Sequence, residues 1–458
     1  MGVRESWVSS TTARRLSVMV VVVAGVGAAR PASADDFAPR CWNAAPGVDA
    51  AADIEFDSAT MRATWQNDPV FAPDGTLIKR GWVTVAPLGT EGSILMDQAS
   101  ECFECSPAPM SLTLGGPEFL SVDGQNFLYF SSLSEDETTV RLAKLSEQPS
   151  GEWALSFLPE SDGKVMFVPG VDSSDAGVKV FYRTVTGSYA TGFQRVDWGW
   201  RVDDPLFVED VTMDPRPFVK KAGYWGNAGD FSGRILPDGS KLAHRALQYR
   251  TLLDLLLGRP RLVPAIYDFE TNQTRPLLDN PRDQTELVEA TWPTAFEAPE
   301  LDGDPVILAV AKIRPQMTNE VVAWRQDATG KWVEWSRIAP VDPDYPCFWN
   351  PQGFVVDGRS YVSVSAFQPL ACYFGFTIPT PSIVWIASLD PDLPEDERVR
   401  RIVSAEAVPG RVSFKTDNEA AVINGNDARV YYIDLPTPLD LVLGTPSVLT
   451  VCETGLKR

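Results

Sequence analysis

The sequence has very little histidine: among its 458 residues, His244 is the only one. A zinc site that needs two or three imidazole ligands is therefore excluded. A Ser-His-Asp triad would have to use His244 itself, which lies on an expected strand beside Arg245, where a structural or surface role is the simpler interpretation. The sequence also has no phosphate-binding loop and no dinucleotide glycine fingerprint in a βαβ setting, so those nucleotide-binding motifs are excluded.

Basic residues are also scarce. The chain has 40 Lys and Arg against 61 Asp and Glu, which gives a net charge of −21. Residues 1–34 contain four Arg and one Glu, so a chain without them would carry about −24. Such a chain repels phosphate backbones and anionic lipid surfaces. We therefore expect no nucleic-acid partner and no membrane partner, and the acidity by itself indicates solubility.

Long apolar runs are missing except near the N-terminus. Arg4, Arg14 and Arg15 precede an uncharged run of 14 residues from Leu16 to Ala29, and Ala32-Ser33-Ala34 has the small-x-small pattern of a cleavage site. A membrane-spanning helix needs roughly 20 residues. Residues 1–34 are therefore predicted to be a cleaved signal peptide, with no membrane insertion afterwards, which predicts a secreted or periplasmic protein. The Arg14-Arg15 pair leaves twin-arginine export open.

Six cysteines follow the predicted cleavage site, an even number that suggests up to three disulfides in an exported chain. Cys41 and Cys452 lie near the two ends and could lock a ring-shaped fold. Cys347 and Cys372 could staple one strand pair. Cys102 and Cys105 form a C-x-x-C, for which a structural bridge or loop clip is favoured over a redox or metal motif, because no βαβ context and no second C-x-x-C is present.

A repeated unit runs along the chain: a polar or acidic residue near Pro or Gly, an apolar run, an Asp-Gly type of turn, and a second β-like run. Asp-Gly and Asn-Gly between apolar runs predict hairpins, because both turn residues tolerate positive φ. We therefore interpret the Asp-Gly aspartates as turn formers. The units occur at residues 67–75, 116–124, 230–239, 296–303, 350–358 and 417–425.

Second hairpins often follow these units, as at 139–153 and 320–335, which gives four strands per unit. The turns are about 50 to 65 residues apart, a spacing typical of propeller blades. We predict an all-β fold in which residues 35–458 form one β-propeller domain of six or seven four-stranded blades. A Leu-rich stretch suggests a helical insertion near 247–258. A pair of β-sandwiches is the main alternative, but it does not explain the repeated order within each unit.

Several segments resemble known propellers. Asp68-Pro69 and Pro117-Glu118, with the following Asp123 to Phe130, resemble the inner blade strands of glycosidases with a β-propeller fold. The segment Leu236 to Leu242 is similar to repeats of the TolB and WD40-like periplasmic propellers, and Asp327 to Trp332 resembles the Asp-box of sialidases with altered spacing. The resemblance implies the β-propeller superfamily, and it implies little about activity because propellers host many functions.

Carboxylate chemistry remains possible. Glycoside hydrolysis needs one protonated and one ionised carboxyl group. If the starts of the innermost strands face a central funnel, the acidic residues there would converge. For a glycosidase we predict Asp68 as base or nucleophile and Glu118 as general acid, with Asp204 or Asp230 tuning them. Other acidic residues expected at the funnel are Glu297 and Glu419. The competing interpretation is that such residues only cap loops.

Aromatic residues gather in a poorly repetitive stretch, where a binding site for a carbohydrate or a protein would be expected. They are Trp198, Trp200, Tyr224 and Trp225, and blade core is the alternative interpretation. No cofactor is expected. A ring of carboxylates could hold Ca²⁺, although no Ca²⁺-loop pattern is present.

Two functions follow from these observations. The first is an exported propeller that binds a protein or carbohydrate ligand on one face of the ring, which the lack of a sharp catalytic motif favours. The alternative is a carboxylate-dependent glycoside hydrolase acting on a polysaccharide. That hydrolase would need two of Asp68, Glu118 and Asp204 about 5 to 10 Å apart.

Overall fold

The structure is a computed structural model. It describes residues 39–457 with gaps at 47–50, 58–59, 68–69, 73–75, 109–115, 134–139, 159–164, 175–176, 189–192, 204–215, 218, 221–233, 237–238, 249–260, 272, 279–286, 314–317, 370–371, 373–379, 395–397, 404–413 and 436–447. Within these residues the elements described over their full length are β-strands and two short 3-10 helices, η1 (Met96–Gln98) and η3 (Pro299–Leu301).

The strands form four-stranded antiparallel meanders, which we call blades and number along the chain. Blade 1 has β2 (Ala51–Asp57), β3 (Arg62–Asn67), β6 (Trp82–Pro87) and β7 (Ser100–Cys102). Blade 2 has β8 (Glu118–Val122), β9 (Gln125–Leu133), β10 (Val140–Glu147) and β11 (Trp153–Phe157). Blade 3 has β12 (Val165–Ser174), β13 (Gly177–Ser188), β14 (Phe193–Asp203) and β15 (Arg216–Pro217).

Blade 4 has β17 (Arg234–Ile235), β18 (Lys241–Gln248), β19 (Arg261–Asp268) and β20 (Gln273–Pro276), with β16 (Val219–Lys220) pairing parallel to β20. Blade 5 has β21 (Leu287–Ala298), β22 (Asp304–Ile313), β23 (Thr318–Gln326) and β24 (Trp332–Ile338). Blade 6 has β25 (Cys347–Val356), β26 (Arg359–Phe367), β27 (Ser382–Ser388) and β28 (Val399–Val403). Among the described residues, the sheets of blades 5 and 6 are joined only by the parallel bridge between Asn319 and Cys347.

Blade 7 combines the two ends of the chain. Its inner strands are β29 (Phe414–Ile423), β30 (Asp427–Leu435) and β31 (Val448–Lys457), and its outermost strand is the N-terminal β1 (Cys41–Asn43), antiparallel to β31. Cys41 pairs directly with Cys452, and a disulfide joins them across a Cα–Cα distance of 4.1 Å. The two cysteines that the sequence analysis paired as a possible lock on the ring are therefore bonded in the structure.

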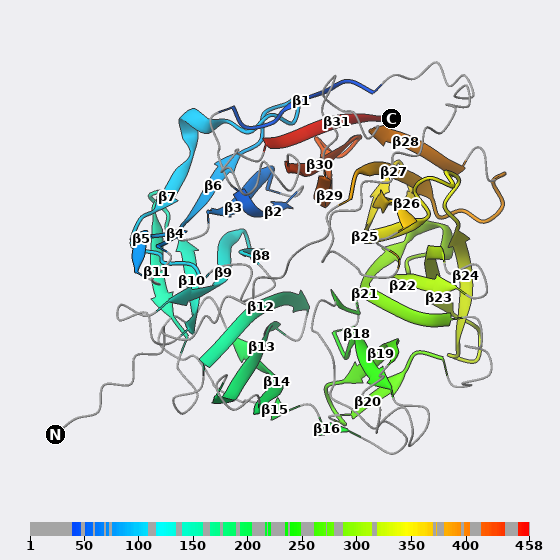
Figure 1. Ribbon diagram of the computed structural model, residues 1–458, viewed down its shortest axis with the longest axis horizontal. Coiled ribbons are helices and arrows are strands. Elements are labelled where there is room, and N and C mark those ends of the chain that lie inside the picture. The colour runs from blue at the N-terminus through cyan, green and yellow to red at the C-terminus, as the bar shows by residue number, and fades with distance from the viewer. Residues whose placement is uncertain are drawn as a thin grey trace.

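The first strand of each blade is the innermost one. These strands contact one another in a closed order, from β29 to β2, β8, β12, β17, β21, β25 and back to β29. Figure 1 shows the sheets following one another round the ring in chain order, until β31 lies beside β1. The protein is an all-β propeller, and the strands of the described residues group into seven blades.

Each seam between neighbouring blades has its own hydrophobic cluster, so the core is divided into seven layers. Strands covered on both faces lose the alternation of buried and exposed residues that a half-exposed strand shows. All of Ser382–Ser388 in β27 is buried, whereas the outermost Trp153–Phe157 in β11 has no buried residue. A blade therefore depends on its neighbours for burial.

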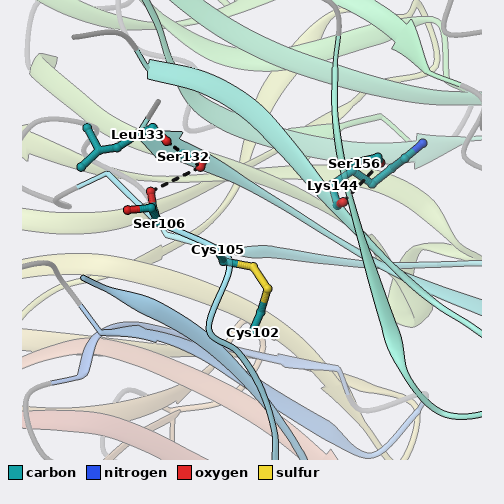
Figure 2. The surroundings of a disulfide bond; sticks show 7 residues. All are labelled: Cys102, Cys105, Ser106, Ser132, Leu133, Lys144 and Ser156. Carbon is teal, nitrogen blue, oxygen red and sulfur yellow. Dashed lines mark hydrogen bonds between the residues drawn. A yellow bond between two sulfur atoms is a disulfide. The ribbon is translucent and has the colours of Figure 1, made fainter. Parts of the chain in front are cut away.

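Two further disulfides are present, again with the predicted partners. Cys347 at the start of β25 is bonded to Cys372, which follows β26. Cys102 at the end of β7 is bonded to Cys105, which is fully buried in the seam between blades 1 and 2 (Figure 2). The backbone carbonyl of Ser106, the next residue, accepts a hydrogen bond from Ser132 Oγ at 3.3 Å, which ties the segment after the disulfide to β9 of blade 2.

The hairpin turns follow the prediction where they are described. Asp123-Gly124 and Asp357-Gly358 both have positive φ at each residue, as a type I′ turn requires. The unit at residues 67–75 is different. It runs from the end of β3 into a separate hairpin of β4 (Val70–Phe71) and β5 (Leu77–Lys79), inserted between β3 and β6. Its interpretation as an innermost strand was wrong, because the same pattern encodes any hairpin.

The predicted helical insertion begins inside a strand. Leu247 and Gln248 belong to β18, where they pair with Leu262 and Arg261. Residues 249–258 lie outside the described residues. His244 also belongs to β18, paired through its backbone with Ala265, as expected for a residue on a strand.

Candidate functional site at the centre of the ring

One register position recurs in the innermost strands. It stands four residues before the last paired residue of the strand, and in β2, β12, β21, β25 and β29 it follows a β-bulge. We call it the inner position. Its residues, in blade order without blade 4, whose residue lies outside the described part, are Asp53, Glu118, Gly170, Thr294, Gln352 and Glu419.

Proline explains much of this regularity. Pro169, Pro293 and Pro351 lie in the bulges of β12, β21 and β25, and Pro117 immediately precedes β8. Proline has no N–H group for the strand ladder, so it is tolerated at a bulge or at the start of a strand. In each case the next residue occupies the inner position. Blades 1 and 7 differ, because Ala52 stands before Asp53 and Asn418 stands before Glu419.

The inner positions are not equivalent in chemistry. Four consecutive blades, 6, 7, 1 and 2, carry Gln352, Glu419, Asp53 and Glu118, which we call the polar arc. Their strands are neighbours, since β25 contacts β29, β29 contacts β2, and β2 contacts β8. Blades 3 and 5 carry Gly170 and Thr294 instead. Acidic and amide residues therefore occupy the inner positions of four neighbouring blades on one side of the ring.

A direct contact joins two members of the polar arc across a seam. Gln352 Nε2 donates a hydrogen bond to Glu419 Oε1 at 2.8 Å, and both side chains are half-buried. A hydrogen bond to a carboxylate is stronger than one between neutral groups. This contact fixes the direction of the Glu419 carboxylate relative to blade 6.

The predicted site residues are distributed as follows. Glu118 and Glu419 occupy the inner positions of blades 2 and 7. Glu297 does not, because it pairs with Pro305 next to the last pair of β21 and is exposed. Five predicted site residues lie outside the described residues: Asp68, Asp204, Asp230, Tyr224 and Trp225.

The two tryptophans of the predicted binding stretch lie in regular structure. Trp198 and Trp200 are in β14, the third strand of blade 3, where they pair with Arg183 and Phe181. We had expected a stretch that breaks the repeat. That expectation was wrong for these two residues, because they lie in a strand of 11 residues within a four-stranded blade. The role of the two tryptophans in ligand binding stays a prediction.

Sequence reasoning missed two members of the polar arc. Gln352 stands five residues before Asp357, the same distance that separates Glu118 from Asp123 and Glu419 from Asn424. Counting back from the turn would have found it. Asp53 gives no such signal, because the turn after β2 spans residues 58–61 and has Met61, not glycine, at positive φ.

Two searches of the described residues bear on metals and membranes. They contain no group of three or more His, Cys, Asp or Glu side chains placed to hold a metal ion, and the expectation for Ca²⁺ stays open. They also contain no helix with the length and apolar character needed to cross a membrane.

Comparisons with known proteins return structural neighbours alone. No protein-family model matches the chain. No curated protein sequence matches it. Among solved structures, the Dos1 propeller is 9% identical and matches over 92% of this chain and 95% of its own, with a TM-score of 0.46.

Two further neighbours are similar over most of their length. A Dyadobacter fermentans protein of unknown function is 10% identical over 75% of this chain and 94% of its own, with a TM-score of 0.44. An exo-1,5-α-L-arabinanase from a bovine ruminal metagenomic library is 10% identical over 73% and 91%, with a TM-score of 0.34. At these scores the propeller assignment rests on the strand order and the closed circuit of contacts.

Proposed function

We propose that this protein is an exported propeller that binds a carbohydrate at the centre of the ring through the polar arc. The observation that carries the proposal is the hydrogen bond between Gln352 and Glu419, which joins the inner positions of two blades. Glu118 occupies the corresponding position two blades further on, with Asp53 at the position between them.

The chemistry of the polar arc favours hydroxyl-rich ligands. Carboxylates accept hydrogen bonds from hydroxyl groups, and a carboxamide both donates and accepts them. The net charge of −21 repels polyanions. We therefore propose a neutral or cationic saccharide in preference to an acidic polysaccharide.

The cysteines support export. All six are paired in disulfides and none is free. Disulfides persist in oxidising compartments and are rare in the cytosol. Together with the leader pattern of residues 1–34, this supports a secreted or periplasmic protein that begins at Asp35. N-terminal sequencing of the protein recovered from outside the cytoplasm tests the cleavage site.

The binding test uses the purified chain from Asp35 on a glycan array, followed by calorimetry with the best saccharide. Glu419→Gln and Glu118→Gln remove charge with little change in shape, and each is expected to weaken binding about tenfold or more. Glu101→Gln is the matched control, because Glu101 is exposed on the outermost strand β7. Equal affinity of all three variants, or binding only to a protein partner, contradicts the proposal.

The hydrolase alternative is tested with the same material. Sugar release from a polysaccharide by the wild-type chain, lost in Glu118→Gln, would replace the binding function by a glycoside hydrolase with Glu118 as its acid. Glu118 is the one member of the predicted catalytic set among the described residues. The hydrolase therefore stays a prediction, and we rank it second to the binding function.

A further inference from the structure

The seam between blades 6 and 7 contains a buried polar cluster that includes Asn418, the residue before Glu419. Asn418, Ser363 and Ser365 are 0%, 0% and 1% exposed. They come from β29 and β26, on the two sides of the seam. Burying polar groups is unfavourable unless each finds a partner, so the contacts of this cluster show what it is arranged to hold.

Asn418 makes three hydrogen bonds there. Its Nδ2 donates to the carbonyl oxygen of Asn350 at 3.0 Å and to Ser363 Oγ at 3.2 Å, while its Oδ1 accepts from Ser365 Oγ at 2.7 Å. The carbonyl of Asn350 sets the direction of the amide, because a flipped amide would turn Oδ1 toward another acceptor. The side chain is therefore held in one orientation.

The residues that these bonds connect precede two members of the polar arc. Asn418 lies in the bulge of β29 immediately before Glu419, and Asn350 lies in the bulge of β25 two residues before Gln352. The side chain of Asn418 thus fastens one bulge to the other across the seam. The two residues that follow the bulges then meet at 2.8 Å.

We infer that Asn418 is a positioning residue that sets the Gln352–Glu419 pair for ligand binding, an inference that rests on the proposed function. A bulge at this place does not require asparagine, since β12, β21 and β25 have Pro169, Pro293 and Pro351 there. Asparagine adds a side chain that reaches the next blade. Its hydrogen bonds are used to fix the bulges and, through them, the carboxylate.

Asn418→Ala is the variant that tests this inference, and Ser382→Ala is its matched control. Ser382 is also fully buried in the same seam, where its Oγ accepts from Lys415 N at 2.6 Å and donates to Lys415 O at 3.1 Å. Both variants remove buried hydrogen bonds between the same two blades. Only Asn418→Ala removes the link between the bulges.

Two measurements on both variants decide the outcome, with thermal unfolding recorded to show that each is folded. In crystal structures, the Gln352 Nε2 to Glu419 Oε1 contact should be lost in Asn418→Ala and kept in Ser382→Ala. Affinity for the saccharide that binds the wild-type chain best should fall about tenfold or more in Asn418→Ala and change less than about twofold in Ser382→Ala.

The inference and the proposed function fail in different ways. If Asn418→Ala keeps the contact, or if both variants lose affinity in proportion to their thermal destabilisation, Asn418 has only a structural role. If the wild-type chain binds no saccharide, the proposed function falls, and the crystal structures alone then decide whether Asn418 positions Glu419. Asn418→Ser, which is too short to reach Asn350, should repeat the result of Asn418→Ala.

Discussion

The two seams that flank blade 7 differ in what fills them. The core of the seam with blade 1 is apolar, with Trp65 and Ile423 in it and Phe56 stacked on Tyr431 at 3.9 Å between ring centroids. Two buried polar groups, Arg429 and the Tyr431 hydroxyl, lie beside Gly92. The seam with blade 6 has an apolar cluster too, but its inner part holds Asn418 and Lys415, both with 0% exposure.

This difference separates two roles. Apolar packing holds blade 7 against blade 1, and within blade 7 the Cys41–Cys452 disulfide ties the N-terminal strand β1, whose chain continues into blade 1, to β31. Buried polar groups add little net stability, and apolar replacements of the same shape are often neutral or better. The polar filling beside blade 6 is therefore better explained by what it positions than by stability. Three substitutions, taken from the largest expected effect to the smallest, test the comparison.

The largest effect is expected from opening the closure. Replacing Cys41 and Cys452 together by Ser should lower the free energy of unfolding by about 6 kcal/mol in the chain-entropy relation, because the disulfide spans a sequence separation of 411. The control pair Cys347→Ser with Cys372→Ser spans 25 residues, and chain entropy predicts a loss smaller by about 2.5 kcal/mol. Urea unfolding of both variants measures the order. Equal losses would mean that β1 is held by its strand pairing alone.

Gly92→Ala is expected to have the next largest effect on the apolar seam. Gly92 has φ +83°, and an added Cβ would lie 2.6 Å from the Oη atom of Tyr431, which donates to the Gly92 carbonyl at 2.7 Å. Strain and the disturbed contact should together cost about 2 to 3 kcal/mol. Gly124→Ala separates the two causes, because Gly124 has φ +81° and no neighbouring atom within 4 Å. Equal shifts in Tm for the two variants would exclude a role for Tyr431.

Much of the fold could be predicted from the sequence because its signals are local. Asp-Gly turns and the spacing of the units indicated a ring of blades, and the ends of the chain indicated the closing disulfide. The same local signals failed at residues 67–75, because a hairpin inserted into a blade has the same pattern as one that starts a blade. Trp198 and Trp200 were misplaced because their strand has no Asp-Gly signal of its own.

The candidate site was less predictable because it depends on register between strands. Glu118 and Glu419 share the inner position with Gln352, yet acidity alone also selected Glu297, which lies next to the turn. Counting residues back from the hairpin turn distinguishes an inner-position residue from one beside the turn. The count works only where the length of the turn is known. The hydrogen bond from Asn418 to Asn350 joins blade 7 to blade 6, and no local pattern in the sequence predicts it.

The smallest expected effect concerns Lys415, which is buried in the polar seam. Burial lowers the pKa of Lys415 from its ordinary value of 10.5, and the facing Asp434 offsets this in part. Between the lowered pKa of the folded state and 10.5, the lysine therefore carries more protons in the unfolded chain than in the folded one. In that range it makes the free energy of unfolding increase with pH. Lys415→Met removes that contribution and should stabilise the protein by about 1 kcal/mol at pH 7.

The gain in Lys415→Met should shrink as the pH is raised from 7 toward 10, because the wild-type lysine then loses its buried charge more readily than the unfolded chain does. Urea unfolding across this range gives the difference between the two proteins, in which other titrating groups cancel. Lys331→Met is the control, since Lys331 is exposed on the turn before β24. If the difference in the free energy of unfolding stays constant with pH, or if the control shows the same trend, Lys415 is hydrated in solution. Its burial in the seam with blade 6 would then cost little free energy.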